Sequence, residues 1–95
     1  MTYSLEFHPS ALDEWKELPE PVKQRFKKKL TERLENPHVP KSRLSGGHNL
    51  YKIKIKHPPF RLTYKVNDNE LVVITLSIGK RDGDVYKQML QRYGK

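Results

Sequence analysis

The stretch LYKIKIK-HPP-FRLTYKV, from Leu50 to Val66, decides the fold. On both sides of its central His-Pro-Pro, apolar and polar residues alternate, which is the period of a strand with one buried and one solvent-facing side. We expect a β-hairpin with a cationic outer face. The inward-pointing residues of its two strands are Tyr51, Ile53, Ile55, Phe60, Leu62, Tyr64 and Val66.

The same alternation restricts how the two strands pair. A shift of one residue would turn lysines into the core, so polar positions must oppose polar positions. With His57–Phe60 as the loop, the expected opposed pairs are Lys56 with Arg61, Lys54 with Thr63, and Lys52 with Lys65. Neighbours on one face of a sheet lie roughly 5–7 Å apart. Lys52, Lys54 and Arg61 are therefore expected in one patch, which Arg81 enters from the end of the next strand.

A third strand follows the turn residues Asn67–Asn69 and leads to Gly79-Lys80-Arg81. With that turn as a three-residue loop, the expected opposed pairs are Lys65 with Leu71, Thr63 with Val73, and Arg61 with Thr75. The residues expected on its core side are Val72, Ile74, Leu76 and Ile78.

The segments on either side of these strands predict a short strand and three helices. Tyr3–Phe7 alternates as a strand, and Pro21–Glu35 has a helical period with Val22, Phe26, Leu30 and Leu34 inward. Between them, after His8-Pro9-Ser10, a helix is expected to turn Leu12, Trp15 and Leu18 to the core, which makes a helical hairpin. After Arg81, Asp82 or Asp84 can cap a last helix. Its apolar stripe is either Val85, Met89 and Tyr93 or Tyr86, Leu90 and Tyr93.

Composition limits the class of protein. Ninety-five residues predict one domain over residues 1–95, of the α+β class, with 35% hydrophobic and 32% charged residues. No apolar run approaches the ~20 residues of a membrane helix, and Met1–Ser4 begins no secretory signal. The absence of cysteine excludes disulfides, thiolate metal sites and cysteine nucleophiles. We expect a cytoplasmic protein.

The net charge of +8 is concentrated in one part of the chain. Residues 41–66 hold seven basic residues and no acid, whereas the rest balances 12 basic against 11 acidic residues. A local excess of this kind favours a polyanionic partner, with nucleic acid the leading candidate. The Lys27-Lys28-Lys29 run on the second helix can either contact phosphates or form a solvated face, and we favour the solvated face.

The usual catalytic sets are missing from the cationic face. It has no pair of carboxylates, and the spacing of His8, His38, His48 and His57 is not that of a zinc motif, so we expect neither a metal nor a cofactor. A cluster of Lys, Arg and Tyr can bind phosphate, or it can help a 2′-hydroxyl attack the neighbouring phosphate of RNA. A cationic neighbourhood disfavours the protonated form of a lysine, as a general base requires. On physical grounds alone, catalysis and plain binding both stay open.

The sequence resembles the RelE-type toxins of bacterial and archaeal toxin–antitoxin pairs. The resemblance covers nearly the whole chain and is carried by Leu50–Lys54, Phe60–Tyr64, Ser77–Arg81 and Val85-Tyr86, together with the first strand and the two helices. It implies an α+β fold related to small microbial ribonucleases, and a metal-independent endoribonuclease that cuts mRNA in the ribosomal A site. The partners implied are mRNA, the small ribosomal subunit with its rRNA, and a RelB-type antitoxin, which alone contacts operator DNA.

The resemblance also implies roles for single residues. Lys52 would be the general base, Lys54 and Arg61 would hold the scissile phosphate, Arg81 would serve the leaving group, and Tyr86 would stack on or orient the nucleotide. The spacer between Arg81 and Tyr86 is shorter than in the family, and Asp82 and Asp84 bring negative charge there. The further basic residues expected to contact RNA or the ribosome are Lys41, Arg43, Lys56, Lys65 and Lys80.

Two other functions stay open beside mRNA cleavage. One is a gyrase-poisoning toxin of the ParE type, which shares the fold but not the Lys/Arg set. The other is a non-catalytic RNA-binding module, which would lose affinity gradually with each basic residue removed.

Overall fold

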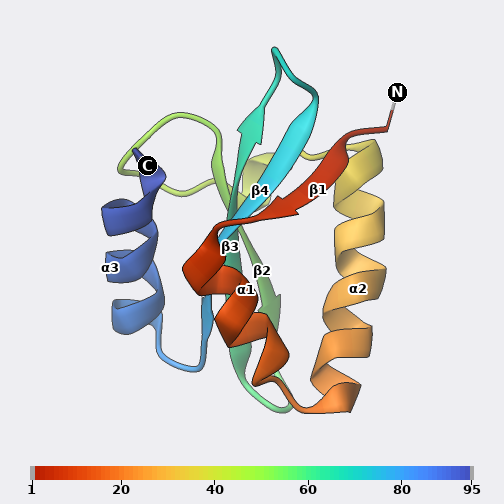
Figure 1. The fold of residues 1–95 in the computed structure, drawn as a ribbon, viewed down its shortest axis with the longest axis vertical. Helices are drawn as coiled ribbons and strands as arrows, with labels where there is room; N and C mark the ends of the chain where they lie inside the picture. The colour runs from red at the N-terminus through yellow and green to blue at the C-terminus, as the bar shows by residue number, and fades with distance from the viewer. Residues whose placement is uncertain (1, 95) are drawn as a thin grey trace.

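Helices pack on both faces of one four-stranded sheet in the computed structural model, which describes residues 2–94 (Figure 1). The sheet has the order β1-β4-β3-β2. Neighbouring strands are antiparallel except β1, which runs parallel to β4. The elements are β1 (Ser4–Phe7), α1 (Pro9–Lys16), α2 (Glu20–Glu35), the short 3-10 helix η1 (Pro40–Ser42), β2 (Leu50–Ile55), β3 (Phe60–Asn67), β4 (Val72–Gly79) and α3 (Asp82–Tyr93).

The predicted α+β class and order of elements are confirmed. The sequence did not predict that β1 adds to the sheet beside β4. None of the helices in residues 2–94 is long and apolar enough to cross a lipid bilayer.

The larger core lies between the sheet and the helices α1 and α2. Val22, Phe26 and Leu30 of α2 are buried at the predicted four-residue spacing. The prediction for Leu12 is wrong, because its side chain is 38% exposed and Ala11 is buried instead. The helix α1 has only eight residues and ends at Lys16, so Leu18 reaches the core from the connection to α2.

A second, smaller core lies under α3 on the opposite face, between Leu50, Leu76 and Met89. Figure 1 shows α2 and α3 on opposite sides of the sheet. We expected the face of the sheet opposite the larger core to be exposed to solvent. This expectation is wrong for the part of that face that α3 covers. Thr63 and Ser77 are completely buried there. Their hydroxyl groups share a hydrogen bond, and the Ser77 Oγ donates to a backbone carbonyl of α3 at 2.8 Å.

The β2–β3 pairing differs from the predicted register by two residues. Lys54 lies opposite Arg61, and Lys52 lies opposite Thr63. The loop is residues 56–59, so Lys56 belongs to the loop and Phe60 begins β3. A shift of two residues leaves every side chain on its predicted face, so hydrophobic alternation cannot detect it.

The β3–β4 pairing also differs from the prediction, by more residues. Asn67 pairs with Val72, and Leu71 turns back at a φ of 56° instead of extending the strand. A β-bulge at Leu76 then shifts the register, so that Thr63 faces Ser77 and Arg61 faces Gly79. As a result, Val73 and Ile78 join the larger core, while Ile74 and Leu76 pack under α3. The prediction that Val72, Ile74, Leu76 and Ile78 share one core side is therefore wrong, because Ile78 lies in the larger core whereas Ile74 and Leu76 lie under α3.

The start of α3 is held close to the end of β4. A Cβ atom at Gly79 would lie 2.9 Å from Val85 Cγ2, so glycine permits this close approach. The N-cap residue is Arg81, and Asp82 occupies the first helical position. The predicted caps Asp82 and Asp84 lie inside the first turn instead, where negative charge is favourable. Of the two predicted apolar stripes, Val85 and Met89 are buried, whereas Leu90 is 51% exposed.

Candidate active site

A row of residues crosses three strands at the end of the sheet where β3 begins and β4 ends. Lys54 on β2 pairs with Arg61 on β3, and Arg61 pairs with Gly79 on β4. Paired residues on one face have Cβ atoms about 5 Å apart. Because Gly79 carries no side chain, the row leaves Lys54 and Arg61 side by side, with Arg81 two residues farther along the chain.

Lys52 lies next to this row, one step inward on β2. It is half-buried and lies opposite the buried Thr63, whereas Lys54 is exposed. The edge of β2 is supported from α2, because Arg33 Nη1 donates to the Lys52 carbonyl at 3.1 Å. The structure therefore brings Lys52, Lys54 and Arg61 together, as the sequence predicted, but through a different pairing.

The Arg61 guanidinium is the most enclosed of these cations. Its side chain is only 14% exposed, and its Nε forms an ion pair with the Asp82 carboxylate. Its Nη1 donates a hydrogen bond to the Lys80 carbonyl. Two segments that follow β4 thus hold Arg61 in place, and one of its contacts is with an acid from the first turn of α3.

Tyr86 lies on the same turn-to-helix segment and is half-buried. Burial raises the pKa of Tyr86, the neighbouring Asp82 carboxylate raises it further, and the Arg61 cation acts in the opposite direction. Tyr86 therefore belongs to the Arg61 surroundings rather than to the apolar core of α3.

Arg81 lies in the chain between Lys80 and Asp82, the two residues that contact Arg61. It is the N-cap residue of α3, and its side chain is exposed. Its carbonyl accepts a hydrogen bond from the Val85 amide at 3.0 Å. This hydrogen bond fixes the backbone of Arg81, while its exposed side chain can contact a ligand at this end of the sheet.

Lys54 and Lys56 also line a groove of about 650 Å³ between β2 and α2. The opposite wall comes from Arg25, Lys28 and Lys29, with Glu32 as an acidic member. The lysine run of α2 is exposed, which agrees with the predicted solvated face. Only the fold shows that two of them face the basic strand; helical phase alone points them away from the α2 core face.

Lys41 and Arg43 lie on and just after η1, and both are exposed. An isolated antiparallel bridge joins Arg43 to Tyr51, which places it along the free edge of β2 beside Lys52. Arg33 ties this segment down, since its Nη2 donates to Ser42 Oγ at 3.1 Å.

Two predicted RNA-contacting lysines lie away from the cluster. The Lys65 Nζ donates to the Tyr93 carbonyl at 2.9 Å, at the far end of α3 from Asp82. The 12 residues of α3 span about 18 Å. Lys80 points to the other face, with its Nζ 5.5 Å from the centre of the Phe60 ring.

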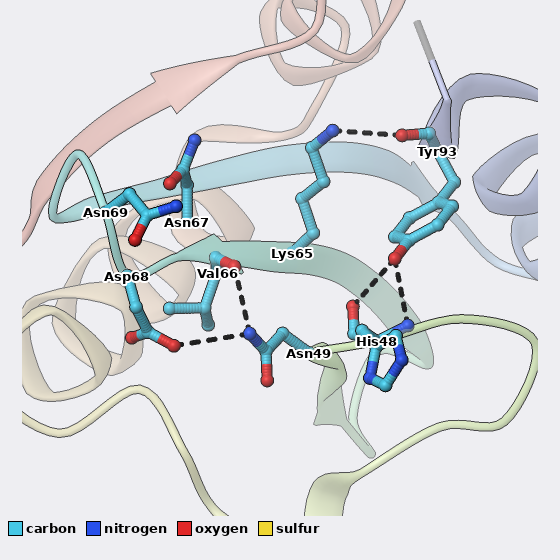
Figure 2. Close-up of a pocket in the computed structure, with 8 residues that line it drawn as sticks. All are labelled: His48, Asn49, Lys65, Val66, Asn67, Asp68, Asn69 and Tyr93. Atoms are coloured by element: carbon cyan, nitrogen blue, oxygen red, sulfur yellow. Dashed lines mark hydrogen bonds between the residues drawn. The ribbon is translucent and has the colours of Figure 1, made fainter.

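Figure 2 shows the pocket around Lys65, with a volume of about 490 Å³. The Tyr93 hydroxyl bonds to the backbone of His48, and Asn49 Nδ2 donates to Asp68 at 3.3 Å. These interactions tie the loop before β2 to the end of α3 and to the β3–β4 turn. This pocket and the cationic cluster lie at opposite ends of α3.

The four histidines lie outside the cluster of Lys52, Lys54 and Arg61. His8 Nδ1 accepts the Ser10 amide at 3.2 Å at the start of α1, and His38 pairs with Asp68 at 3.1 Å. His48 and His57 are exposed loop residues, and the His57 carbonyl accepts from Arg25. Within residues 2–94, no three His, Asp or Glu side chains are grouped as metal ligands.

This chain is similar in sequence to toxins of type II toxin–antitoxin systems. A family model described as "ParE toxin of type II toxin-antitoxin system, parDE" matches residues 5–85. The mRNA interferase toxin RelE of Escherichia coli strain K12 is 41% identical over 93 residues, covering 97% of this chain and 98% of that protein.

Solved structures of E. coli RelE agree with the fold described above. A variant of E. coli RelE with two arginines changed to alanine, in the free state, matches with a TM-score of 0.90. It is 40% identical, and the match covers 97% of this chain and 98% of that chain. A chain of the intact E. coli RelBE toxin–antitoxin complex matches with a TM-score of 0.81 at 41% identity, over 84% of this chain and 98% of that chain. The chain therefore belongs to the ParE toxin family of type II toxin–antitoxin systems and, within it, to the RelE-type toxins.

Proposed function

We propose that this chain is a ribosome-dependent endoribonuclease that cuts mRNA in the ribosomal A site and thereby stops translation. The observation that carries the proposal is the grouping of Lys52, Lys54 and Arg61 on neighbouring strands, with Arg81 two residues beyond the Gly79 that pairs with Arg61. This grouping occurs in a chain that is 41% identical to an mRNA interferase over nearly its whole length.

The proposed chemistry is attack of a 2′-hydroxyl on the adjacent phosphorus. A new bond forms between the 2′-oxygen and phosphorus, the bond from phosphorus to the 5′-oxygen breaks, and the leaving oxygen gains a proton. Lys52 takes the 2′-hydroxyl proton, Lys54 and Arg61 stabilise the charge on the phosphorane, and Arg81 serves the leaving oxygen. The products are a 2′,3′-cyclic phosphate and a 5′-hydroxyl. Cationic side chains supply all the charge stabilisation, so the proposal needs no metal ion.

Tyr86 fits a role in positioning the substrate. Its hydroxyl lies in the surroundings of Arg61, and its ring is half-buried on the first turns of α3. A base stacked on the exposed part of the ring would bring its phosphate towards Arg61.

The exposed members of the cluster explain why a ribosome is needed. Lys54 and Arg81 are exposed and belong to different segments, and an open cationic surface does not orient a flexible RNA by itself. We propose that ribosomal RNA supplies the orientation, and that the groove of Lys28, Lys29, Lys54 and Lys56 binds its phosphates. Lys41 and Arg43 extend this surface along the edge of β2.

The partner of the chain in this proposal is a RelB-type antitoxin that covers the cationic face. E. coli RelE is found in a complex with its antitoxin, and the net charge of +8 on this chain favours an acidic partner segment. Contacts with operator DNA belong to the antitoxin. A role on ribosomes places the toxin in the cytoplasm.

Primer extension on ribosomes paused with an empty A site tests the proposal. A single cut inside the A-site codon supports it. Absence of a cut, together with gyrase-dependent DNA breaks, would identify a toxin of the ParE kind, whose name the family model carries. Salt-dependent RNA binding with neither activity would identify a binding module.

A further inference from the structure

Arg61 already has an anionic partner within the chain. Its Nε forms an ion pair with Asp82, the first residue of α3, and the charges of Arg61 and Asp82 both act on the nearby Tyr86 hydroxyl. Asp82 therefore lies between the two side chains that the proposed function assigns to the phosphate and its nucleotide.

A phosphate and a carboxylate compete for the same face of a guanidinium. Arginine binds either anion through parallel N–H groups, and side-on binding requires its Nε. In this structure the Asp82 carboxylate is ion-paired at the Nε side of the guanidinium, although the buried Nε has no hydrogen-bond partner within residues 2–94, and Nη1 donates to the Lys80 carbonyl. An RNA phosphate can bind Arg61 side-on only after the Asp82 carboxylate has left.

We propose that Asp82 is an internal competitor for the RNA phosphate at Arg61 and thereby sets how tightly the toxin binds RNA. This inference rests on the proposed function, because it takes Arg61 as a phosphate-binding residue. Asp82 is then a specificity-determining residue. An RNA that the ribosome holds in place can displace the Asp82 carboxylate from Arg61, whereas a loosely bound RNA cannot.

The exposure of the two side chains indicates which one moves. Asp82 is 52% exposed, whereas Arg61 is 14% exposed and also held by the Lys80 carbonyl. Displaced Asp82 stays in the first turn of α3, where the helix dipole favours negative charge. The half-buried Tyr86 then has the phosphate as its anionic neighbour in place of the Asp82 carboxylate. Displacement therefore exchanges one anion for another without exposing an unpaired charge.

The test compares Asp82→Asn with Asp84→Asn in RNA binding. Both changes remove one negative charge from the exposed first turn of α3, but of these two acids only Asp82 is ion-paired with Arg61. The probe is a short single-stranded RNA with a 2′-deoxy nucleotide at the cleavage position, followed by fluorescence anisotropy at two salt concentrations. We expect Asp82→Asn to bind about fivefold more tightly than Asp84→Asn. In an Arg61→Ala background the two variants should bind equally.

Equal affinities of Asp82→Asn and Asp84→Asn in the wild-type background would overturn the inference, because only general charge would then matter. Weaker binding by Asp82→Asn would also overturn it and make Asp82 a support for Arg61. The readout needs no cleavage, so it separates the two proposals. If the toxin cuts mRNA but the two variants bind RNA with equal affinity, the proposed function stands and this inference is wrong. If Asp82→Asn alone binds RNA more tightly but the toxin never cuts mRNA, this inference stands and the proposed function is wrong.

Discussion

Glu14 of α1 and Arg92 of α3 meet at the edge of β4 in a two-armed ion pair, although their helices lie on opposite faces of the sheet. The two guanidinium nitrogens approach the two carboxylate oxygens at 2.9 and 3.0 Å. Arg92 also donates to the Leu76 carbonyl at 2.8 Å, and Glu14 accepts the Ile78 amide at 3.1 Å. Since β1 pairs only with the first half of β4, this network satisfies the backbone where β1 has ended.

We expect Arg92→Ala to lower the free energy of unfolding by about 2 kcal/mol, because it leaves a partly buried carboxylate and the Leu76 carbonyl without a partner. Glu14 is 24% exposed and Arg92 is 15% exposed. Urea denaturation measures the change, with Gln91→Ala, an exposed residue of the same helix turn, as control. Equal stability of the two variants would show that the network contributes nothing.

The bond between Tyr3 and Asp68 makes stability depend on pH at both extremes. The Tyr3 hydroxyl donates to Asp68 Oδ1 at 2.6 Å. This bond is the main reason that the pKa of Asp68 is lowered and the pKa of Tyr3 is raised in the folded chain. The contribution of Asp68 is present above about pH 4, the value of an unfolded carboxyl, and is lost as pH falls through the lowered folded value. The contribution of Tyr3 is present below about pH 10 and is lost as pH rises further.

Tyr3→Phe should therefore show a flatter loss of stability in acid than the unsubstituted protein, because the Asp68 carboxylate loses its strongest partner. The measurement is urea denaturation at a series of pH values between about 2 and 6. Asp13→Asn, a change at an exposed acid of α1, is the control. Identical acid slopes for Tyr3→Phe and the unsubstituted chain would contradict this assignment.

Arg61→Lys should slow mRNA cleavage by about 100-fold, even though it keeps the positive charge. A lysine ammonium lacks the planar fork of a guanidinium, so it cannot present two parallel N–H groups to a phosphate while a third nitrogen position is held by the Lys80 carbonyl. Single-turnover cleavage on paused ribosomes measures the rate. Lys16→Ala, at an exposed position of α1 on the other face of the sheet, should cut at the normal rate. A rate for Arg61→Lys within a few-fold of normal would mean that charge alone is needed.

Lys29→Ala should weaken ribosome binding and reduce its salt dependence by about one ion, since Lys29 lines the groove beside Lys54. Lys27→Ala is the matched control. It is two residues away on the same helix, but it lines a hollow with Phe7 and Trp15 on the other side of α2. Equal effects of the two changes would show that the groove has no specific role and that only the total charge of α2 counts.

Much of the fold follows from local patterns in the sequence. The alternation of β2 and β3 places Lys52, Lys54 and Arg61 on one face, because any one-residue slip would bury charge. The periodicity of α2 correctly predicts that Val22 and Phe26 are buried. The pairing registers of β2 with β3 and of β3 with β4 could not be predicted in the same way. A shift by two residues leaves every side chain on the same face of the sheet, so the hydrophobic pattern does not change.

The errors at β4 have a different cause. Its sequence is apolar almost throughout, which is typical of a strand covered on both faces, whereas we assigned its residues to a single core side. The bulge at Leu76 and the turn at Leu71 depend on packing between elements rather than on a local pattern. The covering of Thr63 and Ser77 by α3 follows from that packing.

The contact between Asp82 and Arg61 also depends on the fold. The sequence places Asp82 next to Arg81, and this proximity suggested an effect on Arg81. In the structure the close approach of α3 to Gly79 turns the carboxylate to Arg61 instead. Similarly, the sequence pattern predicts Lys65 on the cationic face, but in the structure its amine donates a hydrogen bond to the Tyr93 carbonyl at the C-terminal end of α3.

The most direct test of the central claim is single-turnover cleavage by Arg81→Ala on ribosomes with an empty A site. Arg81 is exposed and its backbone is fixed as the N-cap of α3, so its truncation should leave folding and ribosome binding intact. We expect one cut within the A-site codon by the unsubstituted toxin and a rate at least about 100-fold lower for Arg81→Ala. An unchanged rate, or the absence of any cut by the unsubstituted toxin, would contradict it.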